Sequence, residues 1–250
     1  GVTSIGNEAF ARMDSLEELS LPSTLETIGA KAFMGKEGSN ALKIVHIPSS
    51  VKDIADDSFI NRKDMTIKAD SKDSRAAAFA LEKGMKLQLG SVADMKISIS
   101  AAKFTYSGKA HKPSVTVEGL EAGTDYTVSY KNNKAIGTGR VEITGKGYYT
   151  GTTVKTFSIV PAKASLKSVK AGKRSVSVKI GKHSGGVSYQ IAYKKSGAGS
   201  WKTISTAKTS RTIKSLKKGK RYTVKVRAYK KVSGKTYYGA WSKTKTVKAK

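Results

Sequence analysis

The residues with the clearest chemistry lie in the stretch SLKKGKRYTVKVRAYKK, which spans residues 215–231. Eight of its seventeen residues are Lys or Arg, and none is acidic. Clustered cations bind polyanions, because neutralising a charged backbone releases its counterions. The same composition occurs in nucleic-acid patches and localisation signals. The stretch therefore has two interpretations, a ligand-binding segment and a structural strand with a basic outer face.

Catalytic and metal chemistry has little support elsewhere in the chain. The histidines, His46, His111 and His183, fall one in each of the three segments described below, so we do not expect them to converge on a metal ion. Cysteine is absent, which excludes disulfides and thiol catalysis. Neither glycine-rich run, GTGR nor GKGYYTG, has the spacing of a phosphate-binding loop. The sequence predicts no catalytic residue, no metal site and no cofactor.

The second half of the basic stretch alternates between apolar and polar residues, which is typical of a half-buried strand. Its apolar face carries Tyr222, Val224, Val226 and Ala228. A Tyr near the start of such a strand in a β-sandwich hydrogen-bonds to upstream backbone, so we expect structural roles for Tyr222 and for Leu216 before it. The remaining cations are expected to face solvent or a polyanion: Lys217, Lys218, Lys220, Lys225, Arg227, Lys230 and Lys231.

Charge is spread unevenly along the 250 residues, whose formal net charge is +29. Residues 164–250 carry 25 Lys or Arg and no Asp or Glu, so paired-carboxylate hydrolysis cannot occur within them. Residues 1–90 carry 12 basic and 13 acidic residues and are nearly neutral. Such asymmetry indicates separate domains. Together with the changes of period described next, it predicts domains at residues 1–90, 91–162 and 163–250.

The first segment repeats itself with a period in the twenties. SIGNEAF at residue 4 returns as TIGAKAF at residue 27 and as DIADDSF at residue 53, so that Phe10, Phe33 and Phe59 keep the same offset. The runs LEELSLP and LKIVHIP lie between these copies. The pattern predicts a solenoid with one short strand per repeat. SRAAAFALEKG then predicts a capping helix that ends at Gly84.

These repeats resemble leucine-rich repeats of the BspA-like class, which occur on bacterial and protozoan surfaces. The resemblance rests on the pattern I-x-x-x-A-F…L-x-x-L/V-x-L/I-P over about residues 2–67, and it implies adhesion to host matrix proteins. Strand positions outside the core are the candidate binding residues, and repeat alignment pairs Glu18 with Ile44 and Ser20 with His46. Because three copies are few for a solenoid, we expect further repeats upstream in the full-length protein.

The other two segments consist of short β-branched and aromatic runs separated by Gly, Asn-Asn and Lys-Pro. Residues 97–160 resemble an immunoglobulin-like repeat common in surface proteins of Gram-positive bacteria. Residues 164–249, which contain AYKKSGAGSWKTI and YYGAWSKTKTV, resemble a bacterial fibronectin type III domain. The predicted fold is therefore multidomain: a leucine-rich-repeat solenoid with a C-terminal capping helix, followed by two all-β immunoglobulin-like sandwiches.

These resemblances imply a non-catalytic extracellular protein, on the cell surface or secreted. The repeats are expected to bind a host matrix protein or a surface glycan, and the sandwiches to act as stalk or wall-proximal modules. An anionic cell-wall polymer is a candidate partner for the basic segment. No helix-turn-helix, zinc-finger or RRM pattern is present, so specific nucleic-acid recognition is not expected. The alternative is the accessory binding region of a larger secreted cell-wall enzyme. Neither a signal peptide nor a membrane span is visible in these residues.

Overall fold

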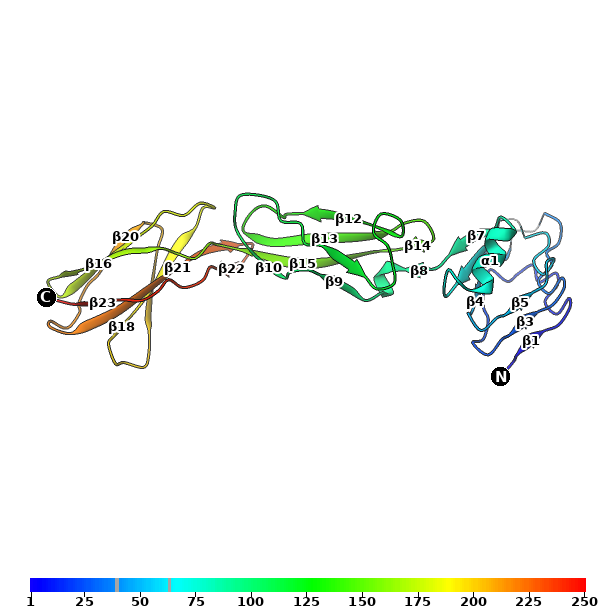
Figure 1. Cartoon of the computed structure of the whole chain (residues 1–250), viewed down its shortest axis with the longest axis horizontal. Coiled ribbons are helices and arrows are strands. Elements are labelled where there is room, and N and C mark those ends of the chain that lie inside the picture. The colour runs from blue at the N-terminus through cyan, green and yellow to red at the C-terminus, as the bar shows by residue number, and fades with distance from the viewer. Residues whose placement is uncertain (39–40, 63) are drawn as a thin grey trace. The chain divides into compact units, whose positions relative to one another are not determined.

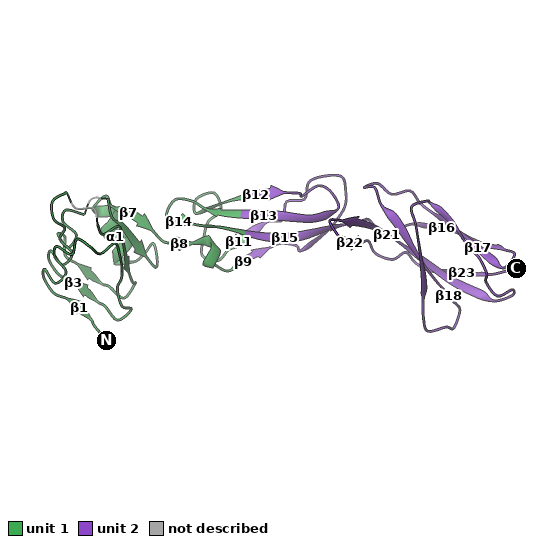
Figure 2. Cartoon of the chain, turned by 180° about the vertical axis from the view of Figure 1, so that it is seen from behind, with its two compact units in different colours: residues 1–97, 116–128, 143–153 green, residues 98–115, 129–142, 154–250 purple. Residues whose placement is uncertain are grey.

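The computed structural model describes residues 1–38, 41–62 and 64–250. The described residues are rich in β-strands and contain one α-helix (Figure 1). None of their helices has the length and hydropathy needed to cross a membrane. They divide into two compact units (Figure 2). Unit 1 comprises residues 1–97, 116–128 and 143–153, and unit 2 comprises residues 98–115, 129–142 and 154–250.

Two parallel sheets are built from the repeats of unit 1. The first has the order β1-β3-β5, with strands Ser4–Ile5, Thr27–Ile28 and Asp53–Ile54. The second has the order β2-β4-β6-β7, with strands Glu18–Ser20, Ile44–Ile47, Thr66–Ala69 and Lys86–Gln88. The register pairs Ile5 with Ile28 and Ile28 with Ile54, as the repeat alignment predicted. Equivalent residues of successive copies therefore stack on one another.

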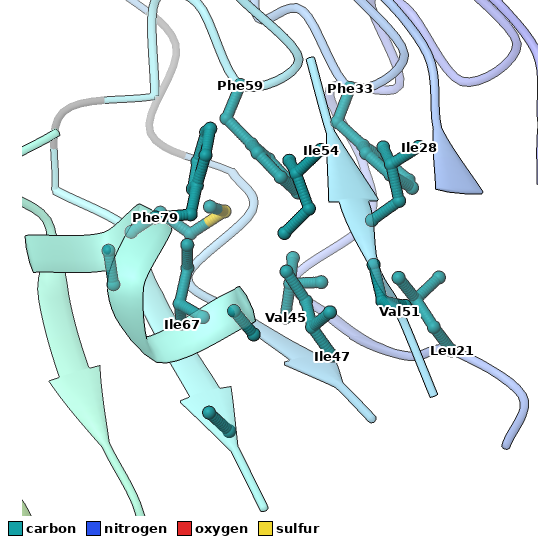
Figure 3. Packing of buried hydrophobic residues seen from close by; sticks show 14 of the residues in the cluster. Leu21, Ile28, Phe33, Val45, Ile47, Val51, Ile54, Phe59, Ile67 and Phe79 are labelled. Carbon is teal, nitrogen blue, oxygen red and sulfur yellow. The ribbon is translucent and has the colours of Figure 1, made fainter. Parts of the chain in front are cut away.

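Phenylalanine rings run through the core of these repeats. The ring centroids of Phe10 and Phe33 are 5.4 Å apart, those of Phe33 and Phe59 are 5.0 Å apart, and both pairs are nearly parallel. Phe79 follows at 5.9 Å from Phe59. Figure 3 shows Phe33, Phe59 and Phe79 side by side in this core. The rings of successive copies cover one another, and Phe33, Phe59 and Phe79 are buried.

Helix α1 (Arg75–Glu82) packs against the last repeat. The Ser74 Oγ accepts a hydrogen bond from the Ala77 amide at 3.2 Å, which caps the first turn. The helix buries three alanines and Phe79. Gly84 then adopts a φ of 63°, the left-handed conformation that ends helices with least strain in glycine. The helix and its glycine stop thus agree with the sequence prediction.

A buried arginine ties the turns of three repeats together. Arg62 is 3% exposed. Its Nε donates to the Phe33 carbonyl at 3.2 Å, and its Nη2 donates to the Met13 carbonyl at 3.3 Å. Its Nη1 lies 3.7 Å from Oδ1 of Asp14. Among the described residues Nη1 has no hydrogen-bond partner, so these contacts compensate the desolvation of the buried guanidinium only in part.

Residues 91–162 form strands of both units. A four-stranded sheet has the order β10-β15-β13-β12, and two-stranded pairings join β9 to β11 and β8 to β14. The ring of Phe157 fills the space that a side chain at Gly139 would need, since a Cβ there would lie 2.4 Å from the ring. The elements are β8 (Gly90–Ser91), the 3-10 helix Val92–Asp94, β9 (Ile97–Ile99), β10 (Lys103–Thr105), β11 (Val115–Val117), β12 (Tyr126–Lys131), β13 (Gly137–Gly145), β14 (Tyr149–Thr150) and β15 (Thr152–Val160).

The last part of unit 2 contains two antiparallel sheets that share one core. The smaller sheet has the order β16-β17-β20, with strands Leu166–Gly172, Ser175–Ile180 and Ser210–Ile213. The larger has the order β19-β18-β21-β22, with β23 also paired to β21; its strands are Lys202–Thr206, Ser188–Lys195, Arg221–Val232, Lys235–Tyr238 and Lys245–Lys248. Val176, Ile191, Val224 and Val226 lie in this core with no exposed surface.

Candidate functional site

The solvent side of sheet β2-β4-β6-β7 brings the predicted repeat residues into two rows. The strand register places Glu18 beside Ile44 and Ser20 beside His46. Alternate residues such as Val45 and Ile67 point into the core and are fully buried. We call the solvent side the outer sheet face; its rows are Glu18, Ile44, Thr66 and Lys86, then Ser20, His46, Lys68 and Gln88. Glu18 makes the β2 edge of this face acidic, whereas Lys68 on β6 and Lys86 on β7 make the opposite side basic.

His46 is held in place by a carboxylate from the next repeat. Its Nε2 lies 2.6 Å from Oδ1 of Asp70, whose Oδ2 accepts a hydrogen bond from the Ser49 amide at 2.9 Å. Desolvation by itself raises the pKa of Asp70, but the hydrogen bonds from His46 and Ser49 outweigh it, and the pKa lies below its ordinary value. The imidazole therefore has a fixed orientation in the middle of its row.

The predicted structural residues of the basic stretch lie in the core of the last two sheets. Leu216 and Tyr222 are buried. The Tyr222 hydroxyl accepts a hydrogen bond from the Lys217 amide at 3.0 Å, so the ring is anchored to backbone five residues upstream. The predicted polyanion-facing cations divide into two groups: Lys217, Lys218, Lys220 and Lys231 are exposed, whereas Lys225, Arg227 and Lys230 are half-buried.

Two of the half-buried cations alternate with aromatic rings on the outer side of β21. The Lys225 Nζ lies 4.2 Å from the ring centroid of Trp201 and 4.9 Å from that of Trp241. The Arg227 Cζ lies 4.4 Å from the centroid of Trp241 and 3.7 Å from that of Tyr238. These distances are within the range of cation–π attraction. We call Trp201, Lys225, Trp241, Arg227 and Tyr238 the cation–ring series.

Rings and backbone carbonyls take the place of carboxylates in this part of the chain. Residues 164–250 contain no Asp or Glu, and the Lys230 Nζ instead donates to the Gly185 carbonyl at 2.7 Å. The Arg227 Nε donates to Oε1 of Gln190 at 2.8 Å. Burial lowers the pKa of Arg227, and Tyr238 opposes that shift only in part. Three of the seven cations that the sequence assigned to solvent or a polyanion are therefore engaged within the protein.

The other two histidines have local partners. The His111 ring lies 4.9 Å from the ring of Phe104. The two ring nitrogens of His183 lie 2.7 Å from the Gly181 carbonyl and 3.1 Å from the Lys163 carbonyl. Across the described residues, no group of His and acidic side chains could hold a metal ion.

The stacked strands and aligned phenylalanines of unit 1 have a counterpart among known families. Residues 1–109 match the BspA type leucine rich repeat region (6 copies). The matched residues include both parallel sheets of the repeats and α1, and the match extends past residue 90 to residue 109. No curated protein matches the chain.

Proposed function

We propose that the chain is part of a non-catalytic extracellular surface protein whose BspA-type repeat region binds a protein or glycan partner through the outer sheet face. The observation that carries this proposal is the pair of in-register rows across β2, β4, β6 and β7. Neighbouring strands are about 4.8 Å apart, so the rows form a regular array of side chains. Repeat proteins use extended surfaces of this kind for recognition. The two immunoglobulin-like sandwiches predicted from the sequence would then serve as a stalk.

The centre of the outer sheet face has the features of a contact site. Ile44 is a half-buried apolar side chain between Glu18 and Thr66. His46 lies two residues along the same strand, and its orientation is set by Asp70. A pre-positioned imidazole loses little conformational entropy on binding, and an apolar neighbour gains from the exclusion of water. These two side chains are therefore the proposed centre of the contact.

Replacing Ile44 by glutamate tests this function. We expect the whole chain to bind at least one member of a panel of immobilised matrix proteins and surface glycans, and Ile44→Glu to weaken that binding by at least about tenfold, because it places a charge in the apolar centre. Lys52→Gln is the matched control, since it makes the same change in charge at an exposed position outside the outer sheet face. The measurement is surface plasmon resonance. Absence of binding to the whole panel, or equal losses in both variants, would contradict the proposal.

We further propose that residues 164–250 bind a polyanion. The observation that favours this second function is the presence of 25 cations and no carboxylate in this part of the chain. Exposed cations such as Lys217, Lys218 and Lys220 would bind phosphate or sulfate groups by releasing counterions. We expect binding to purified bacterial cell wall to fall steeply as salt rises and to fall again when teichoic acid is removed. Equal sedimentation with the two wall preparations would rule out teichoic acid.

A further inference from the structure

A hollow in unit 2 gathers cations from segments far apart in the sequence. Its volume is about 320 Å³, which lies at the lower end of the range for small-ligand pockets. β10 contributes Lys103 and Thr105, and the segment after β15 contributes Lys163. β21 contributes Arg227. The end of β22 contributes Tyr238, and Gly239 follows it. We call this hollow the basic pocket.

The walls of the basic pocket are fixed by close packing. The Gly239 amide donates to the Ala228 carbonyl at 2.9 Å. A Cβ at Gly239 would lie only 2.6 Å from the Pro161 carbonyl oxygen, so the two backbone segments are in direct contact. Tyr237, which precedes the lining residue Tyr238 in β22, shares a hydrogen bond between its hydroxyl and that of Thr138, and it packs with Val160 of the lining and with other apolar residues of unit 2. The pocket is therefore formed before any ligand arrives.

The charges of the basic pocket have no carboxylate partner. Lys103, Lys163 and Arg227 take part in none of the ion pairs formed by the described residues, and no Asp or Glu lines the pocket. Gln190 accepts the Arg227 Nε, and the Tyr238 ring lies against the guanidinium. Within the described part of the chain, the two terminal nitrogens of Arg227 have no hydrogen-bond acceptor. A positioned guanidinium with free donors matches the geometry of an oxyanion.

We propose that the basic pocket binds one phosphate or sulfate group of a polyanion. This inference rests on the polyanion-binding function proposed for residues 164–250, and it adds Lys103, Thr105 and Lys163, which precede them in the chain. Arg227 would supply the directional hydrogen bonds, and Lys103 and Lys163 would supply charge on mobile side chains at the rim. Thr105 also lines the pocket, and its hydroxyl would donate one further hydrogen bond. The pocket would hold one phosphate or sulfate group of the polymer in a defined position. The exposed lysines would attract the polymer without positioning any one of its groups.

The pocket can be tested with inorganic phosphate and sulfate, each added to the ¹⁵N-labelled whole chain and followed by NMR. We expect saturable shifts of the Gly239 amide and of the Arg227 Nε–H signal. Lys103→Gln combined with Lys163→Gln should weaken this binding by about tenfold or more. The matched control combines Lys179→Gln with Lys208→Gln, which removes the same charge from exposed positions of unit 2 outside the pocket. The control should stay within about twofold of the unsubstituted chain.

Shifts that do not saturate and spread over the basic surface would overturn the pocket, and so would equal losses in the two double variants. Both double variants replace exposed side chains, and unchanged dispersion of the remaining NMR signals will verify their folding. A second arm measures retention of the same proteins on immobilised polyphosphate and on a sulfated polysaccharide. Stronger retention on one matrix identifies the source of the anion. Saturable phosphate binding without retention on either polymer would support the pocket and contradict the broader polyanion function, whereas retention without saturable binding would do the reverse.

Discussion

Replacing Phe33 by alanine is expected to destabilise the repeat region by about 3–5 kcal/mol. Phe33 is 1% exposed, and its ring lies between those of Phe10 and Phe59 at centroid distances of 5.4 and 5.0 Å. Removing it leaves a cavity and takes a stacking partner from both neighbours. Because repeats depend on their neighbours for burial, the loss should affect the repeats on both sides. The free energy of opening from native-state hydrogen exchange at the amides of β4 and β6 measures this effect.

The matched control is the same substitution one repeat earlier. Phe10 occupies the equivalent position but is 36% exposed. Among the described residues its ring stacks on Phe33 alone. Phe10→Ala should therefore cost about 1–2 kcal/mol, because less apolar surface returns to water. The fluorescence of the two tryptophans, Trp201 and Trp241, should be unchanged in both variants, since both residues belong to unit 2. Equal costs for the two substitutions would show that the rings do not support one another along the stack.

The repeat region was the most predictable part of the chain, because one period controls both packing and register. Phe10, Phe33 and Phe59 keep one offset in the sequence, and equal offsets become vertical neighbours once the strands pair in parallel. The same rule predicted that Glu18 would lie beside Ile44. Alternation by twos likewise placed Val224 and Val226 on the buried face of β21.

Contacts between residues that neither the repeat alignment nor the alternation within a strand brings together could not be predicted from the sequence. Asp70 directly follows β6, where the preceding copy has Pro48, so repeat alignment does not predict that its Oδ1 lies 2.6 Å from Nε2 of His46. Arg62 is a charged residue in a turn, and only the fold shows that its side chain is buried. The basic pocket depends on Lys103 and Arg227, which are separated by more than 100 positions. Such sites follow from tertiary packing rather than from local pattern.

The cation–ring series shows contacts that a correct strand prediction does not reveal. The alternation correctly places Lys225 and Arg227 on the side of β21 away from the core, where contact with solvent or a polyanion was expected. The tryptophans that cover them belong to the segments SWKTI and AWSKTK, before and after β21 in the chain. A usable signal was present: in residues 164–250 no acidic residue is available, so half-buried cations must find aromatic or carbonyl partners.

Replacing Trp241 by alanine should destabilise the last two sheets of unit 2 by about 2–3 kcal/mol. Lys225 and Arg227 each lose a ring, at 4.9 and 4.4 Å respectively, and each such contact contributes about 0.5–1 kcal/mol. Loss of the half-buried indole adds a packing term. The neighbouring Ser242 exchanges hydrogen bonds with the backbone of Val226, so its segment should loosen from β21. Urea unfolding followed by the fluorescence of Trp201, the remaining tryptophan, measures the change.

Two further substitutions separate the ring contacts from a general loss of aromatic surface. Trp241→Phe retains a smaller ring beside Arg227 and should recover about half of the lost stability. Tyr148→Ala removes an aromatic side chain that is 44% exposed and belongs to unit 1, so the Trp201 transition should move by less than about 0.5 kcal/mol. If Trp241→Ala also changes the free energy of unfolding by less than about 0.5 kcal/mol, the aromatic rings do not stabilise the half-buried cations of residues 164–250. A full loss that Trp241→Phe fails to recover would instead assign the effect to the hydrogen bonds of Ser242.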